Sequence, residues 1–260
     1  MFFEQKAANL SDAHLQTELG RYILCRQKEL ILDLVVPHAG ERVLDVGCGS
    51  GNHLEFFRDK WCSITGIDPS AEMLEIARTK LGNSAELILS QAEDLPFSDD
   101  EFDIVTLINV LEIAKNPKKI IAEAIRVCRG RVFIGFLNNY SFVGTKQRLK
   151  ELFGFPLSQK IRFLNLNEIR MIVGNLIDNP VIQWGSVIYF PSIVYGFFEE
   201  LEELFPLEKN PLGAFTGLTF PVKYTYRTVQ SPIMESFKLN PKTQTTAAGT
   251  ARDMLQETHK

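Results

Sequence analysis

The sequence predicts a doubly wound α/β fold, in which helices cover both faces of a mostly parallel sheet. Apolar, strand-like segments alternate with helix-like segments as far as residue 137, and this order favours a parallel sheet. The first strand-like segment runs directly into a glycine-rich turn. The chain has 260 residues, enough for one large domain with appendages, and its hydrophobic fraction of 45% is ordinary for a globular protein.

The glycine-rich turn organises the chain. It lies in the run VLDVGCGSG at residues 43–51, in which Val43, Leu44 and Val46 have the apolar character of a strand buried on both faces. Gly47, Gly49 and Gly51 then let the backbone turn sharply and leave room for a ligand against the main chain. A strand, a glycine turn and a helix in succession predict a nucleotide-like site.

Four further strands are expected, each followed by turn or capping residues. Ser70 caps the helix after the second strand, and Pro117 occupies the first turn of the helix after the fourth. A long helix precedes the sheet over residues 11–36, with Ser11 or Asp12 as its cap. The second to fifth strands are expected at 62–67, 86–89, 102–108 and 131–137.

The rest of the chain is less regular. Asn167 is expected to cap a helix from Glu168 to Leu176, and a second, amphipathic helix is expected at 192–205. Two further strands are expected at Val181–Phe190 and Ala214–Tyr224. The predicted domains are an N-terminal helical cap at 1–40, a main domain at 41–228 with an insert at about 138–165, and a polar, flexible tail at 229–260.

Three motifs in order and spacing identify a family. VLDVGCGSG at 43–51, GIDPS at 66–70 and QAEDLPFSDDEFDIV at 91–105 each follow or end a successive strand. With them, the chain resembles the class I SAM-dependent methyltransferases, in the branch of the ubiquinone and menaquinone biosynthesis enzymes. The resemblance covers residues 41–137 well and the later part only in architecture. It implies a Rossmann-like sheet of seven strands, mostly parallel, with the last strand antiparallel.

The resemblance also implies a cofactor, S-adenosyl-L-methionine (SAM), and the residues around it. The glycine turn faces the methionine part, Asp45 supports its amino end, and Asp68 accepts the ribose hydroxyls. The adenine lies near Gln91, Ala92 and Glu93. The expected SAM contacts are Asp45, Gly47, Cys48, Gly49, Gly51, Asp68, Pro69, Met73, Gln91, Ala92, Glu93, Ile108 and Asn109.

Each assignment has a purely structural alternative. The three glycines could serve only close packing of strand and helix, and Asp68 could cap a helix beside Ser70. Glu93 and Asp94 could be a solvated pair in a turn. Asn109 could be an ordinary helix cap, and Cys48 is a small residue that fits the turn rather than a nucleophile.

The predicted reaction is an in-line displacement, in which a nucleophilic O, N, S or C atom of a small acceptor takes the methyl group. Tyr140 and His14 are the candidate general bases. The 19 phenylalanines make an apolar acceptor plausible, although they could simply pack the extra layer. No metal site is expected. Two alternatives are a non-catalytic SAM-fold protein, since Ile113 stands where many enzymes of this branch carry His, and a nicotinamide-dependent oxidoreductase, whose GxGxxG pattern the turn lacks.

Charge and cysteine content bound the partners. A net charge of −4 predicts no broad nucleic-acid-binding surface. The four scattered cysteines form no CxxC pair, which favours a reducing, cytoplasmic location. Neither a secretory signal nor an apolar run of the ~20 residues that a membrane-spanning helix needs is expected.

Overall fold

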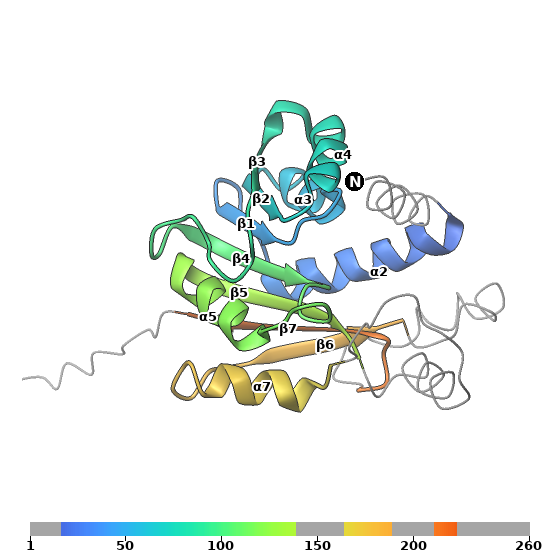
Figure 1. The fold of residues 1–260 in the computed structure, drawn as a ribbon. Helices are drawn as coiled ribbons and strands as arrows, with labels where there is room; N and C mark the ends of the chain where they lie inside the picture. Colours follow the sequence, from blue (N-terminus) through green and yellow to red (C-terminus); the bar gives the residue numbers. More distant parts are fainter. Residues whose placement is uncertain (1–16, 139–163, 189–210, 223–260) are drawn as a thin grey trace, which may run out of the picture. The chain divides into compact units, whose positions relative to one another are not determined.

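The computed structural model describes residues 17–138, 164–188 and 211–222. These residues form one sheet of seven strands in the order β3-β2-β1-β4-β5-β7-β6 (Figure 1). Strands β1 to β5 pair in parallel, whereas β7 pairs antiparallel with both β5 and β6. The predicted doubly wound fold is therefore confirmed, including the antiparallel last strand. The strands are β1 Arg42–Val46, β2 Ser63–Asp68, β3 Ala85–Leu89, β4 Phe102–Ile108, β5 Cys128–Leu137, β6 Gln183–Val187 and β7 Phe215–Pro221.

Helices cover the sheet in two layers (Figure 1), and each layer has its own apolar core. On one face Leu30, Leu54 and Leu74 come from three different helices and pack together in one buried cluster. On the other face Ile120 and Ile169 belong to a second cluster. The first layer holds α2 Glu18–Val35, α3 Asn52–Arg58 and α4 Ala71–Leu81, and the second holds α5 Pro117–Val127 and α7 Leu166–Gly174. A 3₁₀ turn, η1 Gly82–Ser84, follows α4.

The helix caps explain where the helices begin. As predicted, the side chain of Ser70 accepts the backbone N–H of Met73 at the start of α4. Pro117 is the first residue of α5, and the Asn116 side chain caps that helix. The cap predicted at Asn167 is wrong, because Asn165 caps α7 and its Oδ1 accepts the N–H of Asn167.

Other predicted bounds shift by a few residues. The helix expected from residue 11 is seen as α2, whose N-cap is Thr17; Ser11 and Asp12 lie outside the described residues. The fifth strand begins earlier than expected, at Cys128, because that residue pairs with Phe102 beyond an irregularity in the β4–β5 register. Among the described residues, the ladders of the last two strands cover Gln183–Val187 and Phe215–Pro221, and residues 189–190 and 223–224 of the expected ranges lie outside them. The helix expected at 192–205 lies outside the described residues.

Arg131 of β5 ties the end of α2 to the sheet. Its guanidinium donates to the backbone oxygen of Val35, to that of Val36 at 3.0 Å and to both carboxylate oxygens of Glu41 at 2.8 Å. These bonds satisfy carbonyls that a helix C-terminus leaves without helical partners. Arg131 therefore holds α2 on the sheet from its C-terminal end.

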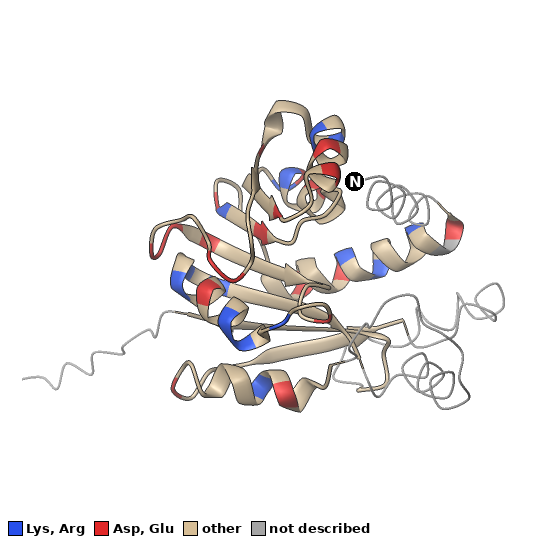
Figure 2. Cartoon of the chain, viewed as in Figure 1, with Lys and Arg blue, Asp and Glu red and all other residues tan. Residues whose placement is uncertain are grey.

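The described part of the chain carries charges of both signs. Figure 2 shows acidic and basic residues interspersed along the helices. None of the helices in the described ranges is long and apolar enough to cross a membrane. The chain divides into two compact units, Met1–Tyr224 and Thr225–Lys260, and every described residue belongs to the first. The predicted domain limits at residues 40 and 228 stay predictions.

Candidate functional site

The candidate site lies where the carboxyl ends of β1, β2 and β4 meet. Asp45 of β1 is in register with Gly66 of β2 on one side and with Thr106 of β4 on the other. The parallel pairing brings the glycine turn, Asp68 and the end of β4 to the same edge of the sheet. Ligands of open α/β sheets bind at this edge.

The glycine turn is fixed against the end of β2. The N–H groups of Gly47 and Cys48 both donate to the carbonyl of Ile67, at 2.8 and 2.9 Å. Gly47, Gly49 and Gly51 have φ values of 73°, 52° and 79°, in the left-handed region that glycine tolerates. The predicted sharp turn is present.

The three glycines are needed for different reasons. A Cβ on Gly47 would lie 2.4 Å from Val110 Cγ2, and one on Gly51 would lie 2.9 Å from Leu81 Cδ1. At these two positions close packing accounts for glycine, as the structural alternative proposed. A Cβ on Gly49 would meet no atom within 4 Å. Of the three glycines in this turn, Gly49 is the one whose backbone borders open space that a ligand could occupy.

Asp68 ends β2 and is 8% exposed. Its Oδ2 accepts the N–H of Gly49 at 2.9 Å, and its Oδ1 accepts the N–H of Ser70 at 2.8 Å. Burial raises the pKa of the carboxyl, and these two hydrogen bonds oppose the rise. A carboxylate oxygen can accept a second bond, so Asp68 links the glycine turn to α4 and retains acceptor capacity. Pro69 follows it, and Met73 lies in the first turn of α4.

Asp45 is a buried acid with one oxygen unused. The Thr106 hydroxyl donates to its Oδ1 at 2.6 Å, while Oδ2 is buried and finds no hydrogen-bond partner among the described residues. Burial is the main cause that raises the pKa of Asp45 to about 7. An unpartnered, buried carboxylate oxygen is costly, and a ligand that donates a hydrogen bond or carries positive charge would relieve it.

The segment after β3 holds Gln91, Ala92 and Glu93, with Gln91 exposed and the other two half-buried. The adjoining Leu95 and Phe97 are anchored to α5. Arg126 donates to both of their carbonyls, at 3.0 and 2.8 Å, and Glu123 accepts the N–H of Leu95 at 3.0 Å. Arg126 and Glu123 therefore position this segment, a role that their sequence context did not reveal.

Ile108 and Asn109 lie at the end of β4. Ile108 is buried, and Asn109 is exposed with a φ of 56°, while its N–H donates to Gly135 O at 2.9 Å. The alternative that Asn109 caps the next helix is wrong, because Asn116 caps α5. Asn109 thus occupies a strained turn at the site edge.

The side chain of Cys48 does not face this open space. It is 4% exposed, and its Sγ packs 2.8 Å from the position that a Cβ on Gly66 would take. Burial raises the pKa of its thiol, which keeps it protonated. The side chain thus fills a gap beside β2, as its small size predicted.

Glu112 was not predicted as a site residue. It follows β4, is 4% exposed, and its Oε1 accepts the N–H of Leu137 at 2.7 Å. Its Oε2 is buried without a hydrogen-bond partner in the described part of the chain, and burial raises its pKa to about 7. Nothing in the sequence around Glu112 signals this burial. The usual pattern is reversed here, because the apolar neighbour Ile113 is 71% exposed while the acidic Glu112 is buried. Both candidate general bases, Tyr140 and His14, lie outside the described residues.

Part of the chain matches a known protein family. Residues 44–134, which run from β1 into β5, match the model of the methyltransferase domain. The chain is 37% identical to a ubiquinone biosynthesis O-methyltransferase of Thiobacillus denitrificans over 41% of this chain and 49% of that protein. It is 32% identical to a demethylmenaquinone methyltransferase of Renibacterium salmoninarum over 45% of this chain and 50% of that protein.

Solved structures agree on the fold. A SAM-dependent methyltransferase from Thermotoga maritima has a TM-score of 0.64 at 18% identity, over 84% of this chain and 97% of that one. The predicted resemblance and the Rossmann-like fold are thereby confirmed. The chain spans about half the length of the curated relatives it matches.

Proposed function

We propose that this chain, whose residues 44–134 are a methyltransferase domain, is an enzyme that transfers a methyl group from SAM to a small acceptor. The observation that carries the proposal is the position of the domain on the fold. The first two motifs reach the carboxyl ends of β1 and β2, the third begins just after β3, and Gly49 borders open space at this edge of the sheet. The fold alone would support many functions, so the residues at this edge decide the assignment.

The residues present fit SAM. The unpartnered Oδ2 of Asp45 offers an acceptor to a charged amino group. Asp68 has acceptor capacity for ribose hydroxyls, and the open side of Gly49 leaves room against the main chain. Gln91, Ala92 and Glu93 follow β3, one strand beyond Asp68, and we propose that they contact the adenine. SAM is therefore the cofactor that this site holds.

When bound, SAM supplies a sulfonium methyl group that an acceptor atom takes by in-line displacement, which leaves S-adenosylhomocysteine. The chain's own part is to position two molecules and exclude water. Asp45 and Asp68 fix the donor, and the tether from Arg126 holds the segment after β3 in place. If the methyl acceptor must lose a proton, we propose that Tyr140 or His14 takes that proton as the general base.

The acceptor is proposed to be small and apolar. Two of the relatives are named for ubiquinone and demethylmenaquinone, and these names favour a quinone-like ring. We also propose a cytoplasmic location. All four cysteines are free, and Cys48, Cys62 and Cys128 are buried, as expected in a reducing compartment.

Calorimetry with SAM and S-adenosylhomocysteine tests the donor site. The wild-type chain should bind both, and Asp68→Asn should weaken binding by about 1–3 kcal/mol through the loss of charge-assisted hydrogen bonds. Asp103→Asn is the matched control, because Asp103 also accepts a backbone N–H, that of Arg42 at 2.9 Å, but at the opposite end of the sheet.

No binding at about millimolar ligand, which corresponds to roughly −4 kcal/mol, would contradict the proposal. Equal losses of SAM affinity in Asp68→Asn and Asp103→Asn would mean that Asp68 acts only on the stability of the fold. Binding without methylation of any quinone-like acceptor would favour the non-catalytic alternative.

A further inference from the structure

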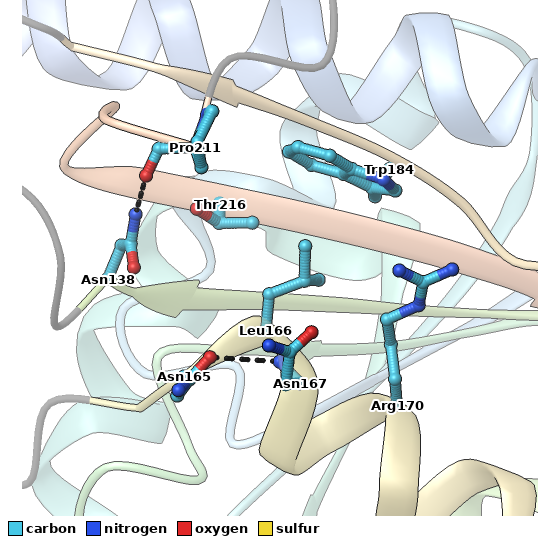
Figure 3. A pocket seen from close by; sticks show the side chains of 8 residues that line it. All are labelled: Asn138, Asn165, Leu166, Asn167, Arg170, Trp184, Pro211 and Thr216. Atoms are coloured by element: carbon cyan, nitrogen blue, oxygen red, sulfur yellow. Dashed lines mark hydrogen bonds between the residues drawn. The ribbon is translucent and has the colours of Figure 1, made fainter.

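A cavity lies between α7 and the strands β6 and β7 (Figure 3). Its volume of about 290 Å³ is near the lower end for small-molecule sites. Its lining comes from four places in the chain that the sheet brings together: Asn138, Asn165, Leu166, Asn167, Arg170, Trp184, Pro211 and Thr216.

One wall of the cavity holds a polar group that the fold does not satisfy. Thr216 of β7 is 1% exposed, and its Oγ1 is buried without a hydrogen-bond partner among the described residues. Beside it, Asn138 is fixed by donating from Nδ2 to the carbonyls of Pro211 and Gly213, at 2.6 and 3.0 Å (Figure 3). A buried hydroxyl without a partner is destabilising unless something else binds it.

The opposite end of the cavity is positively charged and apolar. Arg170 and Trp184 lie there (Figure 3), and the cavity also includes the N-terminus of α7, whose dipole favours an anion. Glu168 lies in the same first turn but does not line the cavity. Leu166 and Trp184 supply an apolar surface between the polar groups.

We propose that this cavity binds a small molecule with a carboxylate on an apolar or aromatic body. Arg170 and the N-terminus of α7 bind the carboxylate, and Trp184 and Leu166 contact the body. A single arginine matches a planar carboxylate in a bidentate pair. A phosphate would bring more negative charge than this one cation balances. The proposal does not rest on the proposed methyl transfer.

Fluorescence of Trp184 tests the site directly. The chain has two tryptophans, and Trp61 is 82% exposed on the other side of the sheet, so Trp61→Phe leaves Trp184 as the sole reporter. Benzoate should change its emission saturably. Benzyl alcohol, which has the ring without the charge, and inorganic phosphate, which has charge without the ring, should bind at least about tenfold more weakly.

Two variants in the Trp61→Phe background locate the ligand. Arg170→Gln should weaken benzoate binding at least about tenfold, whereas Arg78→Gln, on the exposed side of α4, should leave it unchanged. Calorimetry with SAM should give the wild-type affinity for Arg170→Gln.

The proposal is overturned if benzoate gives no saturable signal up to about 20 mM, roughly −2 kcal/mol of binding. Equal affinity in Arg170→Gln, or tighter binding of phosphate than of benzoate, would also overturn it. Because SAM binding is measured on the same preparations, failure of this site is distinguishable from failure of the donor site.

Discussion

Replacing Gly49 with alanine separates the cost of a strained backbone from the loss of a ligand. Gly49 has a φ of 52°, and an added Cβ would meet no protein atom within 4 Å. The left-handed conformation costs a non-glycine residue about 1–2 kcal/mol. Unfolding free energy should therefore fall by about that amount. If SAM lies against this turn, its affinity should fall by at least about tenfold, or roughly 1.4 kcal/mol, because the new methyl group enters its space.

Gly40→Ala is the matched control. Gly40 has a φ of 85°, and its added Cβ also meets nothing within 4 Å, but it precedes β1 at the other end of the sheet. Its unfolding free energy should fall about as much, by 1–2 kcal/mol, with no change in SAM affinity. Urea unfolding measures the first quantity and calorimetry the second.

Gly47→Ala adds a steric contribution. Its Cβ would lie 2.4 Å from Val110 Cγ2, so overpacking of about 1–3 kcal/mol adds to the cost of its φ. Adding Val110→Ala to this variant should restore the stability lost to overpacking but not the stability lost to backbone strain. Equal SAM affinities for Gly40→Ala and Gly49→Ala would refute the reasoning, because the turn would then not contact the ligand.

Three further changes test single groups. The pKa of Asp45 is about 7, and a positive charge bound beside it displaces its proton. SAM affinity, measured by calorimetry, should therefore rise with pH up to about 7 and then level off. In Asp45→Asn this dependence on pH should be flat. For Glu112 the folded-state pKa of about 7 lies above its ordinary 4.5, so the folded state holds the proton more tightly and stability falls as pH rises between these values. In Glu112→Gln, the stability measured by urea unfolding should not fall with pH in this way. A pH profile equal to that of the wild type would contradict this expectation. Arg131→Gln should lower unfolding free energy by about 2–3 kcal/mol, because Arg131 binds the end of α2 and Glu41; the exposed control Arg78→Gln should cost less than about 1 kcal/mol, and equal losses would argue against that role.

Much of the donor site could be predicted because it is local in sequence. The glycines, Asp68 and the cap Ser70 each follow a strand within a few residues. Parallel strands bring their carboxyl ends to one edge, so the order of elements nearly determines where these residues meet. The different reasons for Gly47 and Gly49 could not be predicted, since they depend on whether Val110 lies opposite.

The sequence by itself determined the fold class, the resemblance to the methyltransferases and the edge of the sheet at which the motifs meet. Only the tertiary structure revealed that Glu112 is buried against Leu137 and that Thr216, Arg170 and Trp184 line one cavity. The three cavity residues come from separate segments, and they meet through the antiparallel pairing of β6 and β7 and the packing of α7. Burial and an unsatisfied hydroxyl depend on such long-range contacts, which a local pattern does not encode.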